Sequence, residues 1–255
     1  LMLVDSHCHL DATRFDEDRA QVLARARDAG VVQQVVPAVT AAGWPRLREV
    51  CRQAPGLYPA YGLHPMFMDD HRQAHLVELA QWLERERPCA VGECGLDFFV
   101  QGHDPAQQLW FFEAQLRLAR QFDLPVIVHA RKAVDAVTAA IRRVGGLRGV
   151  VHSFSGSPQQ AAMLYREGFL LGLGGPMTWP RAQRLQALVK QMPLEQLLLE
   201  TDAPDQPDAE IGGQRNEPAR LQVIARHVAS LRGVALDEVA RVTSDNARRL
   251  FGLPG

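Results

Sequence analysis

The sequence contains no long hydrophobic run. A helix that crosses a bilayer needs about 20 consecutive apolar residues, and no stretch of these 255 residues comes near that length. Nor does a basic segment followed by an apolar one mark a secretory signal peptide. We therefore expect a protein that has no membrane as a partner and that works in the cytoplasm.

Cysteine is scarce, and the charges nearly cancel. The four cysteines, Cys8, Cys51, Cys89 and Cys94, show no CxxC spacing, which favours reduced thiols over a disulfide framework. The formal net charge is −1. That balance argues against a protein that binds duplex nucleic acid through a large basic surface. It is compatible with an enzyme that binds a phosphate locally through metal ions.

The chain also lacks a low-complexity tract, a repeat with a period of about 20–50 residues and a linker that would divide it. Its 255 residues suit one α/β barrel. The hydrophobic content of 47% and the charged content of 22% are ordinary for a globular protein. We predict a single domain over residues 1–255.

Signals for strands and helices alternate along the whole chain. Eight short apolar runs bounded by glycine and proline indicate buried parallel strands. Amphipathic stretches of helical period lie between them, such as residues 16–29, 106–122 and 180–190. This order predicts a (β/α)8 TIM barrel, and residues 235–250 predict an extra C-terminal helix beneath or beside it. The predicted strands are Leu3–Asp5, Val32–Ala38, Leu57–Gly62, Cys89–Gly92, Pro125–His129, Gly149–His152, Phe169–Gly172 and Leu197–Thr201.

Five of these runs end in side chains that can bind a hard or borderline metal ion. Because active sites lie at the C-terminal ends of barrel strands, these side chains should meet at one face. Burying them there is costly without compensation. A metal centre is the simplest compensation, so the sequence predicts an enzyme. The residues are His7, His9, Glu93, His129, His152 and Asp202.

The candidate ligands differ in what they can do chemically. A carboxylate such as Glu93 has two oxygens and can bridge two cations, which an imidazole cannot do. Asp202 could hold a metal ion and also accept a proton from a bound water. Glu200 lies two residues earlier on the same strand face and is predicted to hold a ligand histidine. His7 and His9 are two apart, so on a strand both side chains should leave the same face.

Each candidate also has a purely structural interpretation. Glu93 can pair with an arginine, and Asp202 can cap the turn that follows it. A lone histidine after an aliphatic run is more often a core residue bonded to a carbonyl, but His129 and His152 end successive strands. Four histidines, two carboxylates and an open face favour a two-metal hydrolytic site, with Zn, Mn, Fe, Co or Mg as the candidate ions.

Further features surround the expected site. His64 ends the third strand and is predicted to contact substrate or donate a proton to the leaving group, with a plain loop residue as the alternative. Arg131 could bind an anionic substrate or pair with a loop carboxylate. The glycine run at 172–175 could bind phosphate through its backbone or form a tight turn. The polar loop 203–216 is predicted to be a lid or specificity loop, and Asn216 at its end to bind substrate.

The remaining histidines are interpreted as structural or surface residues. His71 and His75 are four apart and could bind a metal ion, but the charged residues that flank them favour a solvated helix end. His103 and His227 are predicted to lie on the surface.

Seven motifs run in order from the first strand to the last, and in combination they resemble the TatD family of metal-dependent hydrolases, within the amidohydrolase-like barrels. The resemblance covers essentially the whole chain. The motifs are Asp5-Ser6-His7-Cys8-His9-Leu10, Gly62-Leu63-His64-Pro65, Gly92-Glu93-Cys94-Gly95-Leu96-Asp97, Pro125-Val126-Ile127-Val128-His129, His152-Ser153-Phe154-Ser155-Gly156, Glu200-Thr201-Asp202-Ala203-Pro204 and Asn216-Glu217-Pro218.

The resemblance implies a (β/α)8 barrel that binds two divalent cations. Known activities in the family are mostly metal-dependent DNA hydrolysis, often exonucleolytic from the 3′ end. His64 matches a family position near the substrate phosphate. The implied ligands are His7, His9, Glu93 and Asp202 for one metal ion, and Glu93, His129 and His152 for the other.

Two places depart from the family pattern. Cys94 stands where an aliphatic residue is usual, and it should face the packing side. The run Asp205-Gln206-Pro207 replaces one that usually contains Tyr and Leu. Together with Gly212-Gly213-Gln214, this change resembles the YjjV-like branch of the family, whose substrate is poorly defined.

Three functional hypotheses follow. The first is a two-metal phosphodiesterase, a 3′–5′ exodeoxyribonuclease that binds single-stranded DNA transiently. The alternative keeps the barrel but cleaves an amide, a lactone, an acyl ester or a small phosphate ester. The third is a non-catalytic metal-binding or nucleic-acid-binding protein, against which the complete ligand set argues. Because a closed barrel exposes no strand edge, we expect a monomer.

Overall fold

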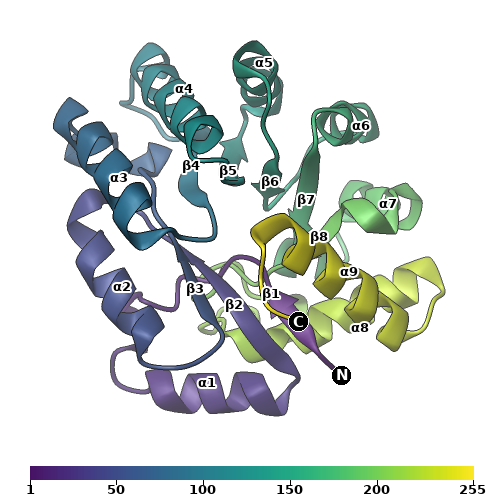
Figure 1. Cartoon of the computed structure of the whole chain (residues 1–255). Coiled ribbons are helices and arrows are strands. Elements are labelled where there is room, and N and C mark those ends of the chain that lie inside the picture. The colour runs from purple at the N-terminus through teal and green to yellow at the C-terminus, as the bar shows by residue number, and fades with distance from the viewer.

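The computed structural model describes residues 1–255, and its strands alternate with helices around a closed barrel (Figure 1). The strands pair in parallel and in chain order within a sheet of three and a sheet of five, and a bridge between Tyr61 and Val91 links the two sheets, as the predicted TIM barrel requires. The barrel prediction is confirmed. The strands are β1 (Leu3–Asp5), β2 (Val31–Pro37), β3 (Leu57–Ala60), β4 (Val91–Asp97), β5 (Val126–Arg131), β6 (Gly149–His152), β7 (Phe169–Leu173) and β8 (Leu197–Leu199).

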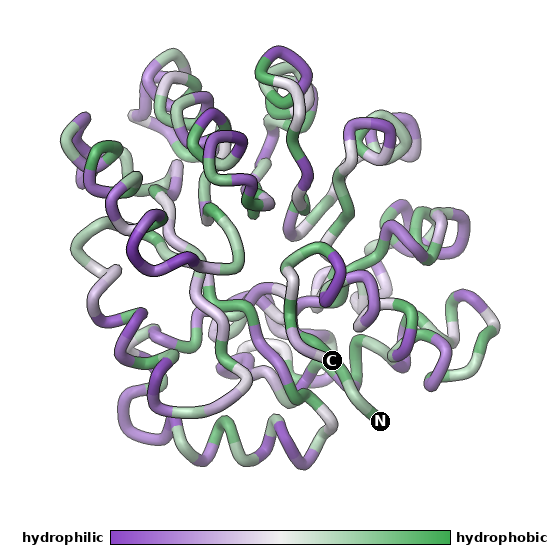
Figure 2. The backbone as a smooth tube through the Cα atoms, in the orientation of Figure 1, coloured by the Kyte–Doolittle hydropathy of each residue, from purple (hydrophilic) through white to green (hydrophobic).

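A helix follows each strand on the outside of the barrel, and α9 is the extra C-terminal helix that the sequence predicts (Figure 1). Figure 2 shows hydrophobic and hydrophilic residues alternating along these helices, since each packs only one face on the strands. None of them is both long and apolar enough to cross a membrane. The helices are α1 (Arg19–Asp28), α2 (Trp44–Arg52), α3 (Gln73–Glu86), α4 (Pro105–Gln121), α5 (Val134–Val144), α6 (Pro158–Arg166), α7 (Gln183–Gln191), α8 (Leu221–Arg232) and α9 (Leu236–Phe251).

The predicted end of β4 is wrong, whereas β1 ends at the predicted residue, and both outcomes bear on the site. β4 continues to Asp97, because residues 94–97 keep pairing with β5. β1 ends at Asp5, so His7 and His9 lie beyond the strand and not on it. Strand alternation therefore does not orient these two histidines. Their segment is held by Asp202, whose N–H donates to the His7 carbonyl at 2.8 Å.

The barrel closes at two seams between a sheet of β1–β3 and a sheet of β4–β8. At one seam the N–H of Gly92 donates to the carbonyl of Tyr61 at 2.9 Å, and at the other the N–H of Ser6 donates to Leu199 at 3.0 Å. A Cβ atom on Gly62 would lie 2.7 Å from the carbonyl carbon of Gly92. Glycine at position 62 therefore lets β3 approach β4 closely enough to close the barrel.

An apolar layer fills the barrel interior and closes one of its ends. Helix α9 crosses the ends at which the strands begin (Figure 1): Asn246 donates to the carbonyl of Leu197 at 2.9 Å, and Ser244 donates to Met2 at 3.0 Å. The opposite end, where the strands finish, stays open and carries the predicted ligands. The layer contains Val4, Val35, Ala60, Ala90, Ile127, Val150 and Leu198 from the barrel and Ala247, Leu250, Phe251 and Leu253 from the C-terminal segment.

Truncating the buried ring of α9 should destabilise the protein. Phe251 is 5% exposed within the interior layer, so Phe251→Ala is expected to cost about 3–5 kcal/mol of unfolding free energy. Urea denaturation measures this loss. The matched control is Val77→Ala on α3, where the side chain is 63% exposed and the change should stay within about 0.5 kcal/mol. Equal effects of the two substitutions would show that α9 does not close the barrel.

Candidate metal centre

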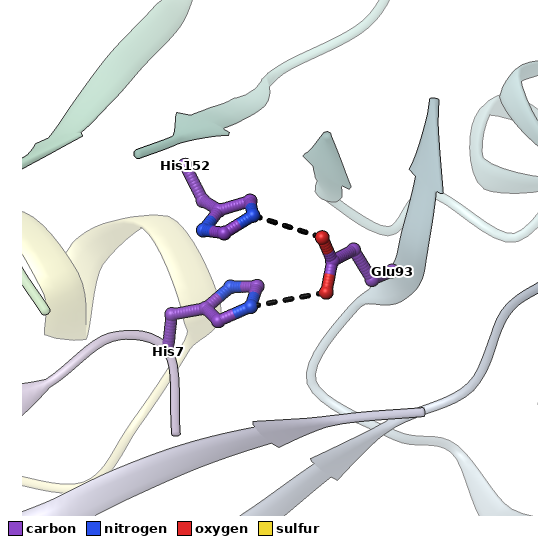
Figure 3. Close-up of side chains that lie close together, drawn as sticks. All are labelled: His7, Glu93 and His152. Carbon is purple, nitrogen blue, oxygen red and sulfur yellow. Dashed lines mark hydrogen bonds and ion pairs between the residues drawn. The ribbon is translucent and has the colours of Figure 1, made fainter. Parts of the chain in front are cut away.

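The structure brings all six predicted ligands together at the open end of the barrel. Glu93 stands at the centre of the group on β4, and its side chain is 1% exposed. Figure 3 shows His7 and His152 directing ring nitrogens at its two oxygens. The rings of His7 and His152 stack with their centroids 3.7 Å apart, so segments about 145 residues apart in sequence meet face to face. The converging ligands are His7, His9, Glu93, His129, His152 and Asp202.

The two oxygens of Glu93 face two different sets of histidines. Oε1 lies 3.1 Å from Nε2 of His7 and 3.4 Å from Nε2 of His9. Oε2 lies 2.8 Å from Nε2 of His152 and 3.2 Å from Nδ1 of His129. A carboxylate that divides its oxygens in this way has the geometry of a bridging ligand.

Asp202 completes the first set. Its Oδ1 lies 3.4 Å from Nε2 of His7 and 3.3 Å from Nε2 of His9. Its Oδ2 accepts a hydrogen bond of 2.8 Å from the side-chain amide of Gln206. Gln206 in turn accepts from the hydroxyl of Ser153 at 2.9 Å. Sequence analysis noted Gln206 only as a departure from the family pattern, and only its contact with Asp202 shows what it does.

Two outer carboxylates hold the rings of His129 and His152 from behind. Glu200 lies 3.3 Å from Nδ1 of His152, and Asp97 lies 2.7 Å from Nε2 of His129. Each of these rings therefore has a carboxylate at both nitrogens. A neutral imidazole carries a single N–H, so one of the two contacts needs a further proton or a cation. A metal ion inside the cluster meets that need, and the donor set fits it.

Sequence analysis did not assign a role to Asp97. The sequence does contain the signal, because Asp97 follows Glu93 by four residues in a predicted motif. The role depends on β4 continuing to Asp97, which pairs there with Arg131 of β5. The carboxylate also accepts from the N–H groups of Phe99 and Val100 at 3.0 and 2.9 Å, which fixes its position behind His129.

The charges of the cluster favour ionised carboxylates. Burial opposes the negative charge of Glu93, but its interactions with the surrounding histidine rings outweigh burial and hold its pKa well below the usual range. Burial also opposes the charge of Asp202, and its bond with His9 outweighs it, so this pKa is lowered as well. In contrast, burial lowers the pKa of His7, with the charge of His152 acting in the same direction. The cluster thus offers anionic oxygens and, at His7, the neutral imidazole that a cation requires. At His9, His129 and His152 burial favours the neutral ring, but the neighbouring carboxylates outweigh it and raise the pKa.

His64 also lies against the carboxylate of Glu93, but it directs an N–H group at that carboxylate. Its Nδ1 accepts a bond of 3.0 Å from the N–H of Met66, which leaves the ring proton on Nε2. That Nε2 lies 3.1 Å from Oε2 of Glu93. Burial lowers the pKa of His64, so the ring is neutral. His64 therefore acts as an N–H donor at the edge of the cluster.

The two predicted substrate contacts outside the cluster are placed differently. Arg131 donates to Asp97 at 2.9 Å, which is the ion-pair alternative, and its side chain remains 42% exposed in the wall of a cavity. Asn216 is fully buried, and its amide donates to the carbonyls of Thr201 and Asp205 at 2.8 Å each. The side chain of Asn216 does not line the cavity. Its amide is used in these hydrogen bonds, which hold the loop in place.

The prediction for His71 is wrong. It is 7% exposed, and its Nε2 donates to the carbonyl of His64 at 2.7 Å, so it supports the segment that carries His64. His75 accepts from the N–H of Arg72 at 3.0 Å at the start of α3. His103 and His227 are partly exposed.

The cluster forms the floor of an open cavity of about 630 Å³. Gly174 and Pro176 of the predicted glycine turn reach this cavity, as do Pro204 and Gln206 of the predicted lid loop. A Cβ atom on Gly172 would collide with the carboxylate of Glu200. The glycine therefore leaves room for the acid that holds His152.

A (β/α)8 barrel that gathers histidines and carboxylates at the carboxyl ends of its strands is the architecture of a metal-dependent hydrolase. The chain belongs to the TatD family, because the sequence model of the family described as TatD related DNase matches residues 4–252. The family membership predicted from the motifs is thereby confirmed.

Relatives of known sequence and structure agree with this assignment. The chain is 41% identical to YjjV of Escherichia coli K12, an uncharacterized metal-dependent hydrolase, over 98% of each protein. It is 33% identical to the human protein named deoxyribonuclease TATDN3, over 98% of this chain and 94% of the human protein. The crystal structure of YjjV, a TatD homologue, superposes with a TM-score of 0.94 at 38% identity, covering 99% of this chain and 98% of YjjV.

Removing the charge behind His129 should weaken metal binding. Asp97→Asn keeps an oxygen for the Phe99 and Val100 N–H groups but loses the anion that orients the ring. We expect metal affinity to fall about 10–100-fold, as measured by competition with a chelator of known affinity. Glu78→Gln on the exposed face of α3 is the matched control and should bind as the unmodified protein does. Unchanged affinity in Asp97→Asn would contradict the role assigned to this residue.

Proposed function

We propose that this protein is a two-metal phosphodiesterase that removes nucleotides from the 3′ end of single-stranded DNA. The observation that carries the proposal is the division of the Glu93 oxygens between two sets of histidines, His7 with His9 and His129 with His152. A carboxylate shared in this way would let the two sets hold two cations that act on one phosphate.

The residues present divide into two ligand sets for Zn²⁺, Mn²⁺ or Mg²⁺. When bound, two such ions supply an acidified water and neutralise charge on the phosphate oxygens. The first set would be His7, His9, Glu93 and Asp202, and the second Glu93, His129 and His152.

The chain's own groups then orient and move protons. Asp202 keeps Oδ1 toward the cluster while Gln206 holds Oδ2, so one oxygen remains available to accept a proton from the attacking water. His64 is neutral and carries its proton on Nε2. Proton transfer from a neutral imidazole would leave an anion, so His64 is better suited to donate a hydrogen bond to a phosphate oxygen.

Several features favour a single nucleic-acid strand as the substrate. The cavity of about 630 Å³ has the size of an ordinary small-molecule site, which accommodates the end of one strand better than a duplex. The formal charge of −1 also favours binding of the DNA at a few phosphates over binding through a broad basic surface. Arg131 lies in the wall with its side chain 42% exposed, where it can meet a second phosphate. The human relative at 33% identity is named a deoxyribonuclease.

A 5′-labelled single-stranded oligonucleotide with added Mg²⁺, Mn²⁺ or Zn²⁺ tests the proposal. We expect a ladder that shortens from the 3′ end, abolished by EDTA, and slowed at least about 100-fold by Asp202→Asn because the proton acceptor is lost. Asp245→Asn, an exposed residue on α9 at the other end of the barrel, should retain full activity.

The absence of cleavage with every metal, in protein shown to hold two ions, would refute the nuclease. In that case parallel assays with acyl esters, lactones and small phosphate esters would identify the bond that the cluster hydrolyses.

The side-chain amide of Gln206 is expected to affect the reaction rate because it donates a hydrogen bond to Asp202. Gln206→Glu places a second carboxylate beside Oδ2 of Asp202, where the present contact is 2.8 Å. Like charges at that distance repel and raise the pKa of one carboxyl, so we expect kcat to fall about tenfold for Gln206→Ala and further for Gln206→Glu. Steady-state kinetics on the oligonucleotide measures both. Gln214→Ala, exposed in the same loop, is the control. Equal rates in all three variants would remove Gln206 from the mechanism.

A further inference from the structure

One wall of the cavity exposes aromatic rings beside the candidate metal centre. Phe67 is 41% exposed and lines the cavity together with Met66 and Arg131. It belongs to the short helical segment Pro65–Asp70, which directly follows His64. Phe99 lies near this wall, because its ring centroid is 4.5 Å from the guanidinium of Arg131. It is 59% exposed.

The ring of Phe67 is held in place by its neighbours. It packs edge-to-face on His64, with the two ring centroids 5.5 Å apart and an interplanar angle of 87°. Its N–H donates to the carbonyl of His64 at 3.1 Å. His71 donates to the same carbonyl at 2.7 Å, so the backbone below the ring is fixed from two sides. Phe67 is thus an ordered aromatic surface inside the cavity.

Phe67 lines the cavity and Phe99 does not, and the two rings also differ in what they contact. The ring of Phe99 already stacks with the guanidinium of Arg131, which is itself paired with Asp97 at 2.9 Å. The ring of Phe67 meets His64 edge-to-face, and the residue lines the cavity and is 41% exposed. Phe67 is therefore the residue of this wall that can accept a flat ligand group.

The chemistry next to this ring indicates which flat group would bind. The neighbouring His64 presents Nε2–H toward the cluster, 3.1 Å from Glu93, where the scissile phosphate would lie. Because the ring centroids of Phe67 and His64 are 5.5 Å apart, a group that stacks on Phe67 would lie next to a phosphate bound at His64. A nucleotide has this arrangement, with a phosphate and an aromatic base joined by deoxyribose.

We propose that Phe67 is the stacking surface for the base of the nucleotide whose phosphate is cleaved. This inference rests on the proposed function and names the substrate subsite of the same centre. Stacking on an aromatic side chain tolerates every base, because every base has a π-face. The subsite should therefore select for the presence of a base and discriminate little between base identities.

Direct binding tests this subsite without turnover. Isothermal titration of the Mn²⁺-loaded protein compares deoxyadenosine monophosphate with 2-deoxyribose 5-phosphate, which lacks the base. We expect the nucleotide to bind about tenfold more tightly or better, from the usual contribution of one stacked base. Phe67→Ala should remove this difference, and Phe67→Trp should keep it. Phe98→Ala is the matched control, because Phe98 is also 41% exposed but does not line the cavity.

Equal affinity for the two ligands in the unmodified protein overturns the inference, as does failure to bind either of them. An equal loss of both ligands in Phe67→Ala also overturns it, because Phe67 would then only support His64. A base-dependent affinity that vanishes in Phe67→Ala sustains the inference even if no oligonucleotide is cut.

Turnover separates this inference from the proposed function. On single-stranded DNA with an abasic 3′-terminal nucleotide, the unmodified protein should show a KM about tenfold higher than on intact DNA. Phe67→Ala should show the same raised KM on both substrates. Cleavage with equal KM on both substrates in the unmodified protein would leave the exonuclease standing and overturn the stacking subsite.

Discussion

A carboxylate buried at the end of an apolar barrel is unstable unless N–H donors or positive charge surround it. Glu93 is 1% exposed, and ring nitrogens of His7, His9, His64, His129 and His152 lie within 3.4 Å of its oxygens. Histidines that follow four different strands therefore all contact this one carboxylate. The close approach of the strands, helped by glycine at position 62, serves to hold that arrangement.

The outer carboxylates extend the same principle by one layer. Because Asp97 and Glu200 each face the far nitrogen of a ligand ring, the rings of His129 and His152 are aimed before any ion arrives. Asp97 also pairs with Arg131, whose guanidinium packs on Phe99. A continuous set of contacts thus joins the metal cluster to the wall of the cavity, so substrate contacts and metal ligands share one framework.

The strands could be predicted from the sequence because they are short apolar runs, and the six candidate ligands because they stand at or just beyond the ends of five of these runs, which are local signals. Residues defined only by tertiary contacts could not. Asp97 gains its role when β4 continues beside β5, and Gln206 when its loop folds back to Asp202. Asn216 is predicted to contact substrate, but its amide donates instead to carbonyls 15 and 11 residues earlier, and only the fold of the loop brings these groups together. His71 is predicted to be a solvated residue, but its ring donates to the carbonyl of His64, a contact that the sequence does not reveal.

The seam between β1 and β8 has a consequence for how the protein is made. Thr201 donates its hydroxyl to Asp5 at 2.6 Å across a separation of 196 residues, immediately beside the first and last ligands of the cluster. A nascent chain must therefore be extended by 195 residues after His7 before Asp202 is added. Contacts of such long range form slowly, so the newly made protein should gain its metal affinity as a late event, after most helices have already folded.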